Sequence, residues 1–232
     1  MKRICVIVSI IFMMVAVAGA QETPFQAGLN VTIGFPQNEF SDNVDHNGYG
    51  LSGHFGYNIP NSPLTVGANL GFLIYGSKTR KLPLINELVT VDMTTTNSIF
   101  QGHLFLRAQA PQGKARPYID GLFGFNYFDT STSINDEDDF DEIASSHNFS
   151  DGTVSYGGGG GIMIQVYEKP EEQVGRYFNV SVDLGLRYLK GGNARYLKEE
   201  SITIDENNKV HYDPKESTTD LMNFYFGVSF GF

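Results

Sequence analysis

Six ionisable residues stand within stretches of sequence that are otherwise apolar, small or uncharged. Arg107 and Asp120 flank the turn-like segment 111–116 almost symmetrically, so we expect them to face one another on adjacent strands. Because a lone buried charge is costly, this placement predicts an ion pair inside the protein. Asp183 and Arg187 lie four residues apart on one strand face and are expected to join the same network. The full set of candidates is His54, His103, Arg107, Asp120, Asp183 and Arg187.

These six residues allow two kinds of chemistry. They could form a structural network that fills an interior, or a polar track that conducts ions. The glycine run 157–161 leaves part of the same strand faces bare, and it could admit water or make room for large side chains opposite. Its GxGxxG-like spacing does not indicate a dinucleotide site, because no helix follows it.

The densest cluster of potential ligands is acidic. Six carboxylates within a short segment could chelate a hard cation such as Ca²⁺. The spacing lacks the glycine and the final glutamate of an EF-hand loop, so a solvated, self-repelling loop tip is the competing interpretation. The candidates are Asp136, Glu137, Asp138, Asp139, Asp141 and Glu142.

Two histidines lie in polar segments where an enzyme could use them. His147 has Ser145 and Ser146 nearby, and His211 has Asp213, but no spacing supports a catalytic triad. The only cysteine is Cys5, so a thiolate metal cluster is excluded. We therefore expect no catalytic residues, no metal and no cofactor, with an enzyme acting on lipid or peptide as an alternative.

The elements that carry these candidates are predicted to be strands. In residues 25–35 every odd position is apolar and every even position is polar or glycine. Successive side chains of a strand point to opposite faces, so this pattern makes one face wholly apolar. Similar alternation occurs in residues 49–57, 64–74, 100–110, 118–127, 153–166, 178–188 and 222–232.

Short and long connections alternate between these eight segments. A bacterial outer-membrane barrel typically has an even number of strands, with short turns at one end of the barrel and long polar loops at the other. A soluble barrel would use the same alternation with its apolar face inward. It would need charge on its outer face, whereas here the polar face is mostly Gly, Ser, Thr and Asn. The sequence therefore predicts an all-β, eight-stranded antiparallel up-and-down transmembrane β-barrel.

Residues 1–20 have the features of a secretory signal peptide. A positive start precedes an apolar run and the small residues before Gln21, so cleavage is expected near Ala20, with an uncleaved anchor as the alternative. Residues 21–232 would then form one outer-membrane barrel domain. The net charge of -10 makes nucleic acid an unsuitable partner.

The end of the chain supports the prediction of an outer-membrane barrel. Residues 224–232 keep apolar side chains at every second position and close on Phe232, which looks like the assembly signal of Gram-negative outer-membrane barrels. With the signal peptide and eight segments, the chain resembles the small OmpA/OmpX-like outer-membrane β-barrel family. The resemblance implies insertion by the outer-membrane assembly machinery, contact with outer-membrane lipid, and both termini in the periplasm.

Two long connections contain further strand-like sequence. Residues 200–212 predict a short hairpin, which leaves a ten-strand barrel open. Val89, Val91 and Met93 predict that the fourth strand continues beyond the membrane, and their phase relative to Phe100 predicts a bulge near residues 97–99.

The expected role is structural or adhesive, with a lumen filled by side chains and an extracellular ligand contacting the loops. A narrow pore for small solutes is the alternative among transport functions.

Overall fold

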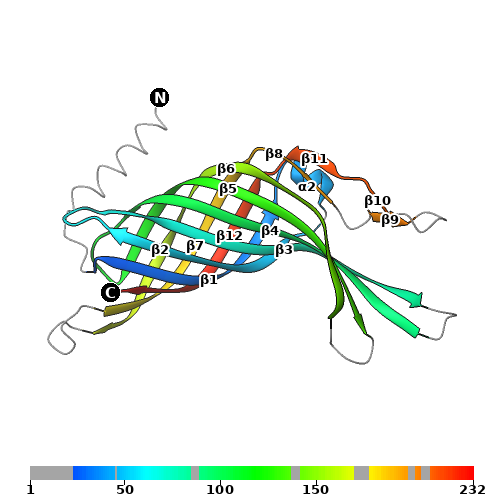
Figure 1. Cartoon of the computed structure of the whole chain (residues 1–232). Coiled ribbons are helices and arrows are strands. Elements are labelled where there is room, and N and C mark those ends of the chain that lie inside the picture. Colours follow the sequence, from blue (N-terminus) through cyan, green and yellow to red (C-terminus); the bar gives the residue numbers. More distant parts are fainter. Residues whose placement is uncertain are drawn as a thin grey trace.

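The computed structural model describes residues 23–44, 46–84, 89–136, 142–169, 178–197, 202–204 and 210–232, so the expected signal peptide lies outside it. Most of these residues lie in strands (Figure 1). The elements are β1 (Phe25–Pro36), α2 (Glu39–Asn43), β2 (Gly48–Asn58), β3 (Leu64–Leu84), β4 (Val89–Gln109), β5 (Ala115–Asp136), β6 (Glu142–Lys169), β7 (Phe178–Gly191), β8 (Asn193–Tyr196), β9 (Ile202–Ile204), β10 (Val210–Tyr212), β11 (Lys215–Thr218) and β12 (Leu221–Gly231).

Among the described residues, eight strands close into one antiparallel barrel, in the order β1-β12-β7-β6-β5-β4-β3-β2. The first and last strands meet at Phe25 and Phe232, which exchange two backbone hydrogen bonds of 3.0 Å. β9 and β10 form a separate two-stranded sheet. The predicted eight-stranded barrel is therefore confirmed, the hairpin within residues 200–212 is present, and the ten-strand alternative is wrong.

The alternation places apolar side chains on the outside of the barrel. Along β1, Leu29 and Val31 are 61% and 59% exposed, whereas Asn30 and Thr32 are buried. Leu104 of β4 is 69% exposed. An outer wall of this kind matches the apolar band that a barrel presents to lipid, and closure leaves no unpaired backbone edge there. The outward facing of the apolar residues rules out the soluble-barrel alternative.

Four strands are longer than a membrane requires. β3 and β4 have 21 residues each, β5 has 22 and β6 has 28, although a tilted strand needs only about 9–11 to span a bilayer. Beyond the barrel these strands remain paired as a projecting sheet (Figure 1). From Ser77 to Leu84, β3 extends by roughly 25 Å at about 3.3 Å per residue.

The predicted bulge near residues 97–99 is wrong. β4 pairs with β5 without a register shift, and the irregularity lies on the neighbouring strand, between Ile74 and Gly76. Even-numbered residues of β4 such as Phe100 therefore face outward throughout, and odd-numbered residues such as Met93 face inward. The apolar residues change face because lipid surrounds the part of β4 that lies in the barrel wall, whereas water contacts the outer face of the part in the projecting sheet.

Tight turns lie at the end of the barrel where β1 begins and β12 ends (Figure 1). Asn61 and Gly113 adopt φ angles of 56° and 99°, a left-handed conformation that asparagine and glycine tolerate best. At the opposite end, α2 lies with the paired strands β8 and β11 as a cap. No helix in the described part of the chain is long and apolar enough to cross a membrane.

Candidate functional site

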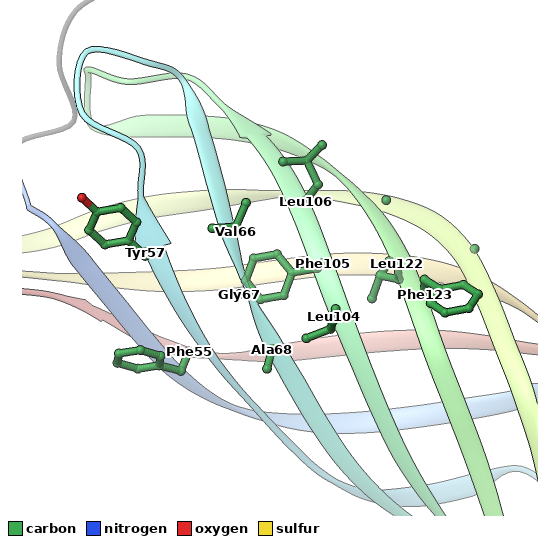
Figure 2. A pocket seen from close by; sticks show the side chains of 12 residues that line it. Phe55, Tyr57, Val66, Gly67, Ala68, Leu104, Phe105, Leu106, Leu122 and Phe123 are labelled. Atoms are coloured by element: carbon green, nitrogen blue, oxygen red, sulfur yellow. The ribbon is translucent and has the colours of Figure 1, made fainter.

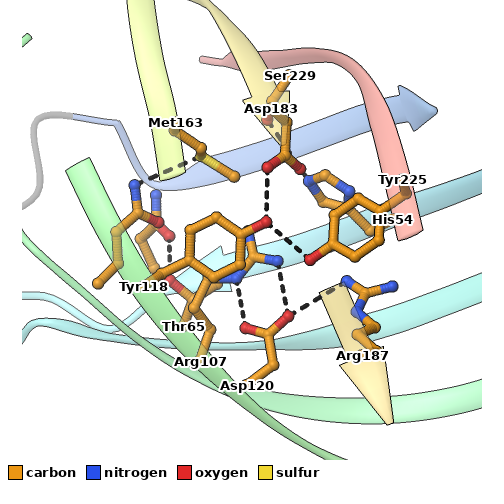
Figure 3. A network of polar contacts seen from close by, with 12 residues as sticks. His54, Thr65, Arg107, Tyr118, Asp120, Met163, Asp183, Arg187, Tyr225 and Ser229 are labelled. Carbon is orange, nitrogen blue, oxygen red and sulfur yellow. Dashed lines mark hydrogen bonds and ion pairs between the residues drawn. The ribbon is translucent and has the colours of Figure 1, made fainter. Parts of the chain in front are cut away.

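The lumen holds a charged layer. Arg107 of β4 lies directly opposite Asp120 of β5 in the strand register. Its Nε donates to Oδ1 at 2.7 Å and its Nη2 donates to Oδ2 at 2.9 Å (Figure 3). Arg187 of β7 donates a third bond to Oδ2 at 3.2 Å. The side chains of Arg107 and Asp120 are fully buried, and a bidentate, charge-assisted pair is the strong arrangement that such burial requires.

Two tyrosines link Asp183 to this layer. The hydroxyl of Tyr118 donates to Oδ1 of Asp183 at 2.6 Å and lies 2.8 Å from the hydroxyl of Tyr225. The guanidinium of Arg107 lies 3.8 Å from the centre of the Tyr118 ring, and that of Arg187 lies 4.4 Å from the Tyr225 ring. These cation–π contacts stabilise charges that are shielded from water. Neither tyrosine was among the predicted site residues, although Tyr225 stands out among the small polar residues on the lumen-facing side of β12.

Glycines in the lumen wall make room for the tyrosine rings. A Cβ atom on Gly161 would collide with Tyr118, and one on Gly185 would collide with Tyr225. Of the two interpretations of the glycine run 157–161, the structure therefore supports room for large side chains.

The two histidines lie in the lumen beside this layer. His54 and His103 are both buried. Nε2 of His54 lies 3.5 Å from the hydroxyl of Ser229, and its ring packs edge-on against Phe105 with centroids 6.3 Å apart. Nδ1 of His54 and Nε2 of His103 have no hydrogen-bond partner among the described residues. The structure thus joins four of the six lumen candidates and leaves the two histidines outside their hydrogen bonds.

A cluster of buried apolar side chains, the apolar plug, lies at the end of the barrel that carries the cap. Phe40 of α2 is fully buried, and its ring centroid lies 5.9, 5.7 and 5.1 Å from those of Tyr75, Phe128 and Tyr196. These rings meet edge to face, a favourable aromatic geometry. The apolar plug comprises Phe40, Val44, Leu73, Tyr75, Ile99, Phe128, Ala194, Tyr196 and Leu221.

The apolar plug was not predicted from the sequence. Leu73 and Tyr75 lie on the lumen-facing side of β3, which also carries Thr65 and Asn69 nearer the start of the strand. Large apolar residues on a lumen-facing phase, near the long loops, are the signal that could have revealed it.

Asp220 fastens the cap to the barrel. Its Oδ2 accepts hydrogen bonds from the Asn38 side chain at 2.7 Å and from the Tyr188 hydroxyl at 3.0 Å. Its Oδ1 accepts a bond from the backbone N–H of Gly191 at 3.1 Å. One carboxylate therefore joins the segment before α2 to the upper end of β7.

A second carboxylate fastens α2 to β11. The backbone N–H and hydroxyl of Thr218 donate to Oε2 of Glu39 at 3.1 and 2.9 Å. Both hydrogen bonds lower the pKa of the Glu39 carboxyl below its usual value, and the bond from the backbone N–H has the larger effect. Glu39 is solvent-exposed, so this contact orients the helix at the surface.

Two of the six acidic candidates lie at the far ends of strands of the projecting sheet. Asp136 ends β5 and Glu142 begins β6. The other four lie outside the described residues: Glu137, Asp138, Asp139 and Asp141. His147 lies in β6 and His211 in β10, which belong to separate sheets. Within the described residues, no three potential metal ligands are grouped closely enough to hold an ion.

Comparisons with known proteins agree with this architecture. The family model for the outer membrane protein beta-barrel domain matches residues 5–232. Neisserial surface protein A is 14% identical with a TM-score of 0.42, covering 92% of this chain and 99% of that one. Ail, the attachment invasion locus protein of Yersinia pestis, is 12% identical with a TM-score of 0.36, covering 90% and 96%. The outer membrane protease OmpT of Escherichia coli is 10% identical with a TM-score of 0.38, covering 92% and 98%.

No curated protein sequence matches the chain. Identities and scores as low as those of the three structures carry no information about activity. The family match, in contrast, spans nearly the whole chain and agrees with a closed barrel whose outer wall is apolar. The chain therefore belongs to the outer membrane protein beta-barrel domain family and is a protein of the outer membrane.

Proposed function

We propose that this protein is a non-conducting, non-enzymatic barrel that anchors a sheet for contacts at the cell surface. The observation that carries the proposal is the presence of two layers of buried side chains inside the barrel. The charged layer around Asp120 fills one level, and the apolar plug around Phe40 fills another. The interior of an eight-stranded barrel is only just wide enough for its own side chains.

The apolar plug argues against the pore alternative. A conducting path needs polar groups or water along its whole length, and an apolar constriction stops conduction by excluding water. The cap is also held in place by several bonds, including the three that Asp220 accepts. Ion flow would require the cap to move.

The projecting sheet is the part of the described chain best placed to meet a partner. The edge strands of this sheet are β3 and β6, and both have features that discourage pairing with other strands. Lys78 and Pro83 lie on β3, and the pairing of β6 with β5 has two register irregularities. We therefore favour contact through the faces and tip of the sheet over addition of a strand at its edge.

The outer face of the projecting sheet is rich in hydroxyl groups. Thr79 and Thr94 lie opposite one another with their hydroxyls 3.0 Å apart. Two cross-strand rows on this face consist of hydroxyl residues, namely Ser77–Thr96–Ser131 and Thr79–Thr94–Ser133. Hydroxyls both donate and accept hydrogen bonds, so this face suits a polar partner such as a saccharide or a peptide.

Shortening the projecting sheet tests the proposal. Residues 79–94 and 133–145 would each be replaced by Asn-Gly, which joins the register partners Lys78 and Thr95, and Thr132 and Ser146, by two-residue turns. Attachment to cultured epithelial cells would be compared for bacteria carrying the full chain, the shortened chain or neither. Heat-modifiable gel mobility would show that both forms fold in equal amounts.

The proposal predicts that the full chain increases attachment and that the shortened chain loses the increase. Equal attachment of bacteria carrying the full and shortened chains would contradict a role for the sheet. So would an absence of any increase while the folded barrel is present at the surface.

A further inference from the structure

A groove of about 840 Å³ crosses the outer wall of the barrel over β2 to β5 (Figure 2). Its two sides are ridges of side chains that face away from the lumen. One ridge is the cross-strand row Phe55–Ala68–Leu104–Phe123, and the other is the row Tyr57–Val66–Leu106–Gly121. No charged residue lines the groove, and the hydroxyl of Tyr57 is the single polar side-chain group among its lining residues.

The floor of the groove is the backbone between the two ridges. The row between them runs from Gly56 and Gly67 to Phe105 and Leu122, whose side chains are buried in the lumen. Because these residues point inward, little projects between the ridges.

The groove opens at its β5 end. A Cβ atom on Gly121 would have no neighbour within 4 Å. Its cross-strand partner on β6 is Gly158, so two adjacent outward positions lack side chains. Leu106 and Phe123, which are 52% and 63% exposed, stand beside this gap. The site is therefore a gap in the apolar outer wall that a larger residue at position 121 would fill.

The width of the groove selects its occupant. Side chains two residues apart on one strand are separated by about 6.6–6.8 Å, which sets the spacing of the ridges. A helix with its side chains is about 10–12 Å across, and packed sheets lie about 10 Å apart. A whole helix or a second barrel wall is too wide to lie in the groove and could insert only side chains, whereas a single hydrocarbon chain can lie along it.

The position of the groove indicates which lipid leaflet supplies the chain. Tyr57 lies one residue from the end of β2, and Leu106 lies three residues from the end of β4. Both strand ends lead into short turns, which face the periplasm in barrels of this kind. We propose that the groove binds one acyl chain of a phospholipid from the periplasmic leaflet.

Tryptophan fluorescence offers a direct test, because the chain contains no tryptophan. The variant Phe123→Trp places a reporter on the groove, and Phe226→Trp places one on lipid-facing β12 as the control. Each would be reconstituted in phosphatidylcholine vesicles containing a small fraction of phospholipid with brominated acyl chains, which quench tryptophan on contact. Gly121→Leu would fill the groove, and Ala68→Leu would block it from β3. Val166→Leu would be the control enlargement, at an exposed position of β6 that does not line the groove.

We expect stronger quenching of the reporter in the groove than of the control reporter. Gly121→Leu should abolish the excess, and Val166→Leu should leave it intact. Ala68→Leu should also abolish it, so the test does not depend on one variant folding. Equal quenching of the two reporters, or an excess that survives both groove variants, would overturn the proposal. Vesicles brominated in one leaflet test the leaflet assignment, which fails if the excess comes from the leaflet nearer the long loops.

Discussion

The substitution Asp120→Asn tests whether the charged layer holds the barrel together. The carboxylate of Asp120 accepts two hydrogen bonds from Arg107 and one from Arg187, and the Arg107–Asp120 pair is fully buried. An amide of the same shape keeps the volume but removes the one carboxylate that both guanidinium groups contact directly. Breaking a buried pair in this way costs about 3–5 kcal/mol, because a charge remains in a medium of low polarity. We therefore expect the free energy of unfolding to fall by that amount.

Urea unfolding in lipid vesicles, with folded protein counted by heat-modifiable gel mobility, would measure the loss. Asp213→Asn is the matched control, because it makes the same chemical change at the exposed pair with Lys215. Exposed pairs contribute at most about 1 kcal/mol, so the control should change little. A loss below about 1 kcal/mol for Asp120→Asn, equal to the control, would refute the role assigned to the charged layer.

Three further predictions concern the cap and the outer wall. Phe40→Ala removes a buried ring, a change that costs about 3–5 kcal/mol in a packed core. Limited proteolysis should therefore cut the cap faster, while the barrel keeps its heat-modifiable mobility. Unchanged cleavage would contradict the packing role of Phe40. The pKa of Glu39 in the folded state lies below its usual value of 4.5. Its contribution to the stability of the cap is therefore complete above pH 4.5 and is lost as the pH falls through the lowered pKa. Protease cleavage of the cap should increase in that acidic range, and Glu39→Gln should remove this dependence on pH. Leu184→Arg places a charge on the lipid-facing wall and should cost roughly 2–4 kcal/mol if Leu184 lies at the bilayer midplane, and an unperturbed urea midpoint would contradict the outward facing.

The barrel could be predicted from sequence because its pattern is set by two contrasting environments. Leu29 and Val31 face lipid while Asn30 and Thr32 face the lumen, and this contrast repeats along every barrel strand. The pairing of Arg107 with Asp120 was also predictable, since two charges at equal distances from one turn must meet in an antiparallel hairpin.

The cap and the apolar plug could not be predicted in the same way. Phe40 belongs to a five-residue helix, which is too short to show helical periodicity. Its partners Tyr75, Phe128 and Tyr196 come from three different strands, and only the closed topology brings them together. The change of apolar face along β4 was misread as a bulge because periodicity does not reveal which solvent lies on each side of a strand.

Conductance across a planar bilayer is the most direct test of the proposed closed lumen. The refolded chain, shown by gel mobility to be a closed barrel, would be inserted at a known density and recorded under applied voltage. The charged layer and the apolar plug predict a bilayer that stays at its baseline current. Discrete current steps that increase with the amount of folded protein would contradict a closed lumen and would favour the pore.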